Sequence, residues 1–116
     1  MESQNIEYKQ SWHDEYLKWV CGFANAQGGG IYIGVDDDGQ VIGVPDAKRL
    51  SEDIPNKIRE HIGIICDVNL LEQNQLPYLR IIVMPSSVPL SVRGCYYYRS
   101  GSVKNELTGT ALNEFL

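Results

Sequence analysis

The sequence of 116 residues predicts an α+β domain, in which a mixed β-sheet with hairpins packs against two to three helices. Three observations support this fold class. Short β-rich segments recur along the chain, two longer segments have the apolar spacing of helices, and glycine or Asx-containing turn signals separate them. The order β-α-β-β-α-β-β-β-α and the length indicate a single domain over residues 1–116.

The first half of the chain supplies a strand, a buried helix and a predicted hairpin. Alternation of Ile6 and Tyr8 with charged neighbours predicts a short strand over residues 6–9. Ser11 is the expected N-cap of a mostly buried helix that runs to about Gln27 and ends at a run of three glycines. Further strands are expected over residues 31–36 and 41–44, joined by an Asp-Gly turn at 37–39.

The second half begins with a helix over residues 47–62, capped by Asp46 and interrupted by Pro55, so we expect a kink or a restart at Ser51. A second hairpin is expected around Asn74 and Gln75. The remaining predicted elements are strands at 68–72, 79–84 and 96–99, and a helix that starts at Thr108 or Thr110. Because the sequence stops within that amphipathic helix, we expect an N-terminal fragment of a longer protein.

Charge and cysteine content narrow the function classes. The net charge is −5, which argues against non-specific nucleic-acid binding by the whole surface, yet residues 77–105 carry a net +4 and no acid. The alternative interpretation is that the four basic residues of this segment are simply separate, solvated side chains. Three cysteines without a C-x-x-C motif indicate reduced thiols in a cytoplasmic protein, and no apolar run is long enough to span a membrane.

An acidic cluster is the first candidate site. Glu2, Glu7, Asp36 and Asp37 carry the hard oxygen ligands that Mg²⁺ or Mn²⁺ prefers. Glu2 and Glu7 are five residues apart, so they converge only if Glu2 lies in a turn before the strand, whereas Glu7 and Lys9 share a face. A polar strand edge and an acidic turn tip are the alternative interpretation. The glycine run lacks the phosphate-loop patterns, so it is interpreted as a turn and no ATP site is visible.

A basic and aromatic cluster is the second candidate site. Cations can hold phosphates, and an aromatic ring beside arginine on a sheet surface can stack on a base. The alternative is that the three consecutive tyrosines reflect ordinary β-propensity. The candidate nucleic-acid-binding residues are Lys9, Arg80, Arg93, Tyr97, Arg99 and Lys104.

Three motifs, in this order, resemble the Schlafen-type divergent Alba domain. They are Glu2-Ser3 with Ile6-Glu7-Tyr8-Lys9, Phe23-Ala24-Asn25-Ala26-Gln27-Gly28-Gly29, and Ile33-Gly34-Val35-Asp36-Asp37. Further matches are Gly39 with Val41-Ile42-Gly43-Val44, and Tyr97-Tyr98-Arg99-x-Gly101-Ser102. Tyr8 and Gly30 depart from the phenylalanine and threonine usual there. In bacteria and archaea this domain forms the N-terminal part of transcriptional regulators described as divergent AAA or RecG-helicase-related proteins.

The resemblance implies a nucleic-acid-binding domain, with DNA as the expected ligand. Eukaryotic Schlafens imply an alternative, a metal-dependent endoribonuclease in which Glu2, Glu7 and Asp37 would hold Mg²⁺ or Mn²⁺ and act with Lys9. Schlafen nucleases use two such lobes and this chain has one, so a homodimer would have to supply the second. A third hypothesis is a protein-interaction or dimerisation domain, which fits the acidic charge.

Overall fold

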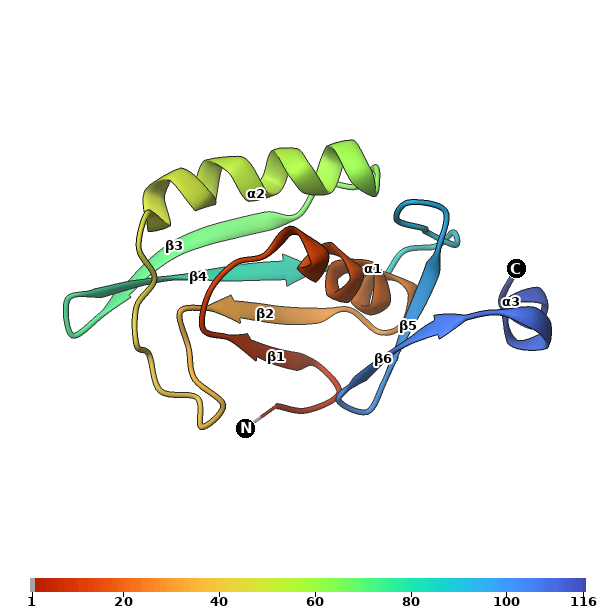
Figure 1. Ribbon diagram of the computed structural model, residues 1–116, viewed down its shortest axis with the longest axis horizontal. Helices are drawn as coiled ribbons and strands as arrows, with labels where there is room; N and C mark the ends of the chain where they lie inside the picture. Colours follow the sequence, from red (N-terminus) through yellow and green to blue (C-terminus); the bar gives the residue numbers. More distant parts are fainter. Residues whose placement is uncertain (1) are drawn as a thin grey trace.

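The computed structural model describes residues 2–116, which form two sheets and three α-helices (Figure 1). A four-stranded sheet has the order β1-β2-β4-β3, and a hairpin of β5 and β6 forms the second sheet. In chain order the elements are β1 (Ile6–Lys9), a 3-10 turn (Asp14–Tyr16), α1 (Leu17–Asn25), β2 (Gly29–Ile33), α2 (Ala47–His61), β3 (Asp67–Gln73), β4 (Leu76–Val83), β5 (Tyr96–Ser100), β6 (Val103–Leu107) and α3 (Gly109–Phe115).

The larger sheet is mixed. β1 pairs with β2 in parallel, and α1 lies between these two strands in the chain, as the crossover of a βαβ unit does. β4 pairs antiparallel with both β2 and β3. The predicted α+β fold class with a mixed sheet is therefore confirmed.

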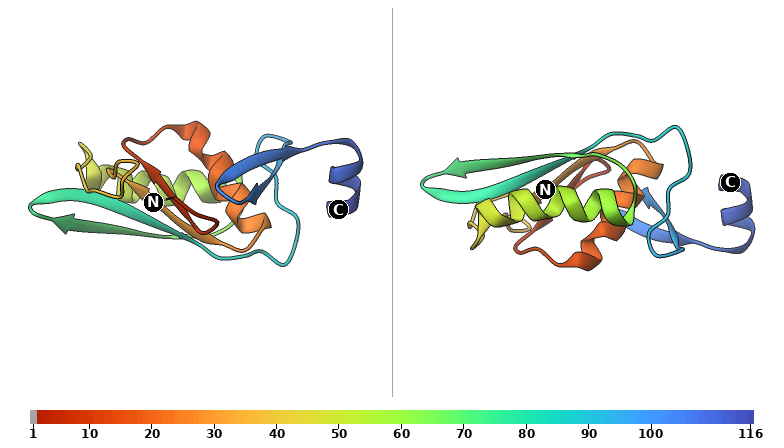
Figure 2. Two further views of the ribbon diagram at one scale, coloured as in Figure 1. Left: turned by 90° about the horizontal axis from the view of Figure 1, so that it is seen from below. Right: turned by 90° about the horizontal axis from the view of Figure 1, so that it is seen from above.

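Both long helices cover one face of the larger sheet and leave the other face open (Figure 2). The side chains that alternate toward the helices, among them Ile31, Ile33, Leu79 and Ile81, are fully buried. They meet Val20 and Phe23 of α1 and Ile54 and Ile58 of α2 in one core. Burial of this apolar surface is the main favourable term in folding the domain.

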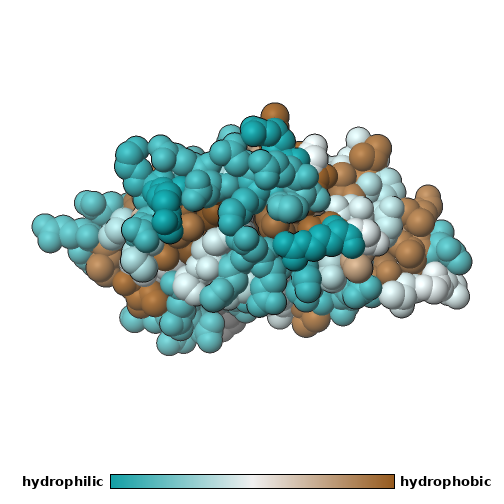
Figure 3. Space-filling model, turned by 45° about the horizontal axis from the view of Figure 1, so that its top comes forward, coloured by the Kyte–Doolittle hydropathy of each residue, from teal (hydrophilic) through white to brown (hydrophobic). Residues whose placement is uncertain are grey.

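The β5–β6 hairpin packs on α1 from the side opposite α2, and α3 extends from its end (Figure 1). Phe115 of α3 contacts the rings of Tyr96 and Tyr98 edge-on. Hydrophilic side chains cover the region of α2, whereas hydrophobic atoms are exposed toward the end where α3 lies (Figure 3). Among residues 2–116 no helix has the length and apolar character needed to cross a membrane.

Several details differ from the sequence prediction. Residues 41–44 form no strand, because Gly34 and Gly43 adopt positive φ angles and leave a single bridge between Val35 and Val41. Conversely, β6 was not predicted, because Lys104, Asn105 and Glu106 hide its strand pattern. Helix α1 starts through a 3-10 turn at Asp14, so Ser11 is not its N-cap.

Helix α2 runs without interruption through Pro55, so the predicted restart at Ser51 is wrong. Asp46 precedes it in a left-handed conformation and makes no side-chain cap hydrogen bond. The second predicted hairpin is confirmed, with Asn74 and Gln75 both at positive φ in its two-residue turn.

Candidate nucleic-acid interface

A buried ion pair between Glu7 of β1 and Arg99 of β5 joins the two sheets. Arg99 is fully buried and Glu7 is 2% exposed. The Arg99 Nη1 atom donates to Glu7 Oε1 at 2.7 Å, and the guanidinium carbon lies 4.3 Å from the centroid of the Phe23 ring. A buried charge is tolerated only when it is paired and hydrogen-bonded, and both conditions hold here.

Arg99 also fixes the segment that precedes β1. Its Nε atom donates to the carbonyl of Gln4 at 2.9 Å, and its Nη2 atom donates to the carbonyls of Ser3 and Ile6. The side chain of Gln4 returns the contact by donating to the carbonyl of Arg99 and accepting from the Gly101 amide. These contacts span more than ninety residues of sequence, so β5 fixes the position of the N-terminal segment.

The same segment brings Glu2 to Glu7. Ser3 and Ile6 form a tight backbone bridge around a turn at Gln4 and Asn5, so Glu2, which precedes the turn, lies back against β1. Glu2 Oε2 accepts from the amide of Tyr8 at 2.9 Å. Burial, followed by a hydrogen bond with the Glu2 carboxyl, raises the pKa of Glu7, although Arg99 acts in the opposite direction. The two carboxyls therefore converge, although the turn that allows it is formed by Gln4 and Asn5 and not by Glu2 itself.

Asp37 does not join them. It lies at the exposed tip of the turn after β2, and Asp36 Oδ1 accepts from the amides of Asp38 and Gln40 and so shapes that turn. Across residues 2–116, no three Asp, Glu, His or Cys side chains are grouped closely enough to hold a metal ion. Glu7 Oε2 is instead 3.2 Å from the Lys9 ammonium. The Glu7 carboxylate is therefore bound by two side-chain cations, Arg99 and Lys9, and the acidic residues described around it do not form a set of ligands for a divalent metal.

Lys9 leads from this pair into a basic hollow of about 340 Å³, which we define by its lining residues Lys9, Glu15, Tyr16, Lys18, Trp19 and Lys104. The Lys9 ammonium lies 4.7 Å from the Trp19 ring centroid and 4.8 Å from that of Tyr16. The Lys104 ammonium approaches Trp19 from β6 at 5.5 Å. Cation–π contacts of this kind hold two ammonium groups at one indole ring, and the ring itself adds no charge that would neutralise them.

Tyr97 supports the second side of the basic hollow. The ammonium groups of Lys18 and Lys104 lie 5.9 Å and 5.4 Å from its ring centroid. Within the described part of the chain, neither Lys18 nor Lys104 forms an ion pair, and the one acidic side chain that lines the hollow is Glu15. A hollow with this excess of positive charge attracts anions such as phosphates.

The predicted binding residues therefore separate into two groups. Lys9 and Lys104 lie together in the basic hollow. The prediction of Arg99 as a surface cation is corrected, because the side chain is fully buried against Glu7. Tyr97 is 6% exposed and lies beneath Lys18 and Lys104, so its ring offers no open face to a base in the basic hollow. Arg80 lies on the open face of the sheet, where it donates to Asn69.

Arg93 lies outside the basic hollow, in the neighbouring pocket described below. Sequence reasoning missed Tyr16, Lys18 and Trp19, which were assigned to a buried helix. The available signal was the spacing of Glu15, Lys18 and Trp19, which places them on one side where the 3-10 turn leads into α1.

Asn25 and the glycines after α1 hold the helix against the hairpin. The Asn25 Nδ2 atom donates to the carbonyls of Leu90 and Tyr97, and its Oδ1 atom accepts from the Leu90 amide, each at 2.8 Å. Gly28 has φ 78°, and a Cβ atom there would lie 2.6 Å from the carbonyl oxygen of Val83. These motif residues are explained by packing, which supports their interpretation as a structural turn.

Comparison with known structures agrees with this fold. A crystal structure of the DIP2311 protein from Corynebacterium diphtheriae superposes with a TM-score of 0.71 at 19% identity, covering 90% of this chain and 22% of that one. A second match is the solution structure of the N-terminal domain of a RecG-related protein from Nitrosomonas europaea, whose name refers to an ATP-dependent DNA helicase. It superposes with a TM-score of 0.67 at 22% identity, covering 93% of this chain and 86% of that one. This chain thus spans about a fifth of the Corynebacterium protein.

No curated protein matches the sequence significantly. The family model described as Schlafen, AlbA_2 matches residues 2–108, which include β1, the Glu7–Arg99 pair and every lysine of the basic hollow. The chain therefore belongs to the Schlafen AlbA_2 family.

Proposed function

We propose that this chain is a nucleic-acid-binding domain and that the basic hollow holds backbone phosphates. The observation that carries the proposal is that Lys9, Lys18 and Lys104, from three different elements, line one hollow. Lysine is a usual phosphate ligand because it is a compact point charge with three donors. The chain as a whole carries a net charge of −5, which would confine binding to this hollow.

The geometry favours phosphate contact over base stacking at Trp19. Two ammonium groups already lie over its ring, so a base could stack there only by displacing them. The name of the Nitrosomonas relative refers to DNA, and family resemblance extends to transcriptional regulators, so DNA is the first ligand to test. RNA of the same sequence is the matched comparison.

The experiment is a titration of labelled single-stranded and duplex oligonucleotides, DNA and RNA, followed by fluorescence anisotropy at low salt. Lys18→Gln and Lys104→Gln should each weaken binding about tenfold, the loss expected for one phosphate contact at low ionic strength. Lys48→Gln is the matched control, because Lys48 is an exposed lysine of α2 outside the hollow. Unchanged affinity in both hollow variants would refute the assignment.

A metal-dependent ribonuclease is the second candidate, and the contact between the Glu2 and Glu7 carboxyls favours it. Against it, Glu7 is already bound by Arg99 and Lys9, and Asp37 lies on an exposed turn. Incubation of structured RNA with Mn²⁺ or with EDTA separates the two candidates. Cleavage that requires Mn²⁺ and disappears in Asp37→Asn would establish the nuclease, and binding without cleavage would support the binding domain.

A further inference from the structure

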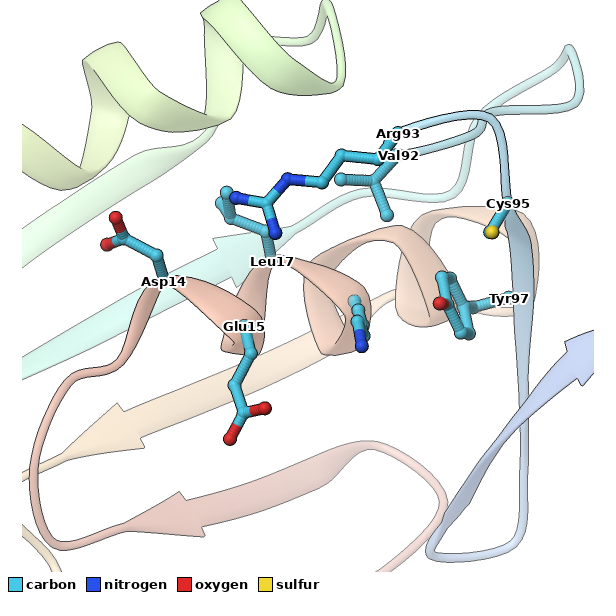
Figure 4. A pocket seen from close by; sticks show the side chains of 8 residues that line it. Asp14, Glu15, Leu17, Val92, Arg93, Cys95 and Tyr97 are labelled. Atoms are coloured by element: carbon cyan, nitrogen blue, oxygen red, sulfur yellow. The ribbon is translucent and has the colours of Figure 1, made fainter.

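We infer that a second pocket, beside the basic hollow, receives one unpaired base that carries an exocyclic amino group, with cytosine preferred over uracil. This inference rests on the proposed function and names the part of the nucleic acid that the site would read. The pocket has a volume of about 220 Å³ (Figure 4). Its lining residues are Asp14, Glu15, Leu17, Lys18, Val92, Arg93, Cys95 and Tyr97.

The two sites are adjacent. Glu15 and Lys18 line both the pocket and the basic hollow. A strand whose phosphate lies among the lysines of the hollow would therefore carry its next nucleotide past Lys18 to the mouth of the pocket. Bases are accessible there only when they are not paired, because a pocket cannot admit a base that remains in a duplex.

The floor of the pocket suits a base. Leu17, Val92 and Tyr97 line the pocket and are almost completely buried, so they form its apolar inner surface. Cys95 lies beside Tyr97 on the same wall (Figure 4). Apolar floors with a few polar groups at the rim are typical of sites for small planar ligands.

The rim supplies both charges that a nucleotide needs. In Figure 4, Arg93 reaches over α1 toward Asp14, and Glu15 lies on the opposite side of the helix. Arg93 and Lys18 are available to the phosphates on either side of the base, since neither forms an ion pair within residues 2–116. Asp14 is already held by Lys57 at 2.7 Å and by Trp12, and these hydrogen bonds lower its pKa.

Glu15 is therefore the acceptor available to the base edge. It is exposed and takes part in none of the ion pairs found in the described chain. A carboxylate accepts from the N4 amino group of cytosine, as acidic side chains do in protein–DNA interfaces. Uracil has a carbonyl oxygen at the same position, which would face the carboxylate with like partial charge.

The test compares oligocytidine with oligouridine of equal length, and the deoxy pair dC and dU in parallel, because the members of each pair share the same backbone. Wild-type protein should bind the cytosine strand about tenfold more tightly, the discrimination expected from one well-placed contact of this kind. In Glu15→Gln the ratio should fall toward one, since an amide can donate to uracil as well as accept from cytosine. Glu60→Gln, an exposed acid of α2, controls for the change in net charge and should keep the ratio.

Cys95 gives an independent readout. It is half-buried, whereas Cys21 and Cys66 are buried and burial raises the pKa of both thiols, to about 11 for Cys66. Alkylation of Cys95 should slow when oligocytidine is bound. Oligouridine at equal occupancy should protect the Cys95 thiol less. Cys95→Ser identifies the labelled thiol.

The outcomes separate the inference from the proposed function. Equal affinity for cytosine and uracil strands would overturn the base pocket and leave phosphate binding intact. A cytosine preference that persists in Glu15→Gln would overturn the role of Glu15. Absence of binding to every oligonucleotide would overturn the proposed function and this inference together.

Discussion

Replacement of Arg99 by methionine should be among the most destabilising single changes available in this domain. The substitution keeps most of the side-chain volume, so it creates little cavity. It removes the partner of Glu7 at 2.7 Å, together with the donors to the carbonyls of Ser3, Gln4 and Ile6. What remains is a carboxylate that is 2% exposed and three backbone acceptors without their donor.

Breaking one side of a buried ion pair costs roughly 3–5 kcal/mol, because the remaining charge stays desolvated. We therefore expect Arg99→Met to lower the free energy of unfolding by about 4 kcal/mol. For a chain of this length, that loss corresponds to a decrease in Tm of about 16 °C. Most domains have only about 5–15 kcal/mol of stability, so the variant should fold incompletely at elevated temperature.

The assay is urea unfolding followed by circular dichroism, with Arg93→Met as the matched control. Arg93 is exposed, so its loss should change stability by less than about 0.5 kcal/mol. The double variant Glu7→Gln with Arg99→Met should lose at least about 1.5 kcal/mol less free energy of unfolding than the sum of the losses in the two single variants, because both single variants break the same ion pair. A cost for Arg99→Met no larger than that of the control would refute the reasoning.

Three further predictions follow from the same contacts. Because folding raises the pKa of Glu7, protonation of Glu7 stabilises the folded state; this contribution to the free energy of unfolding is fully present below pH 4.5 and is lost as the pH rises through the raised pKa. Glu2→Gln should make the free energy of unfolding depend less on pH in this range, as measured by unfolding across pH. Asn25→Ala removes three hydrogen bonds to backbone groups and should cost about 2–4 kcal/mol in urea unfolding, and an effect within error of wild type would contradict the role assigned to Asn25. Gly28→Ala should be destabilised by at least about 1 kcal/mol in thermal unfolding, since its Cβ would meet a backbone carbonyl at 2.6 Å, and a stable variant would disprove that contact.

The sequence predicts elements whose signals are local. β1, the two-residue turn at Asn74 and Gln75, and the end of α1 at its glycines all rest on neighbouring residues, and the structure has each of them. β6 was missed because its polar residues face solvent on a hairpin with little apolar alternation. The return strand at 41–44 was predicted from β-rich composition, which two glycines at positive φ override.

The site shows the same division between local and long-range information. Strand alternation predicts that Glu2 and Glu7 converge only if a turn precedes the strand, and the structure has this turn at Gln4 and Asn5, just after the predicted position. Arg99 was misplaced because its partner is 92 residues away, although Tyr97 and Arg99 alternate inward on β5 with Tyr96 and Tyr98 facing outward. Pairing across such a distance depends on topology, which no local pattern contains.

The most direct test of the central claim is the salt dependence of nucleic-acid binding by wild type and by the double variant Lys18→Gln, Lys104→Gln. Three phosphate contacts predict a slope of log affinity against log salt of about −2 to −3 between about 50 and 200 mM, and loss of two lysines should reduce it to about −1. Equal slopes for the two proteins would show that the phosphates bind elsewhere and would contradict the account.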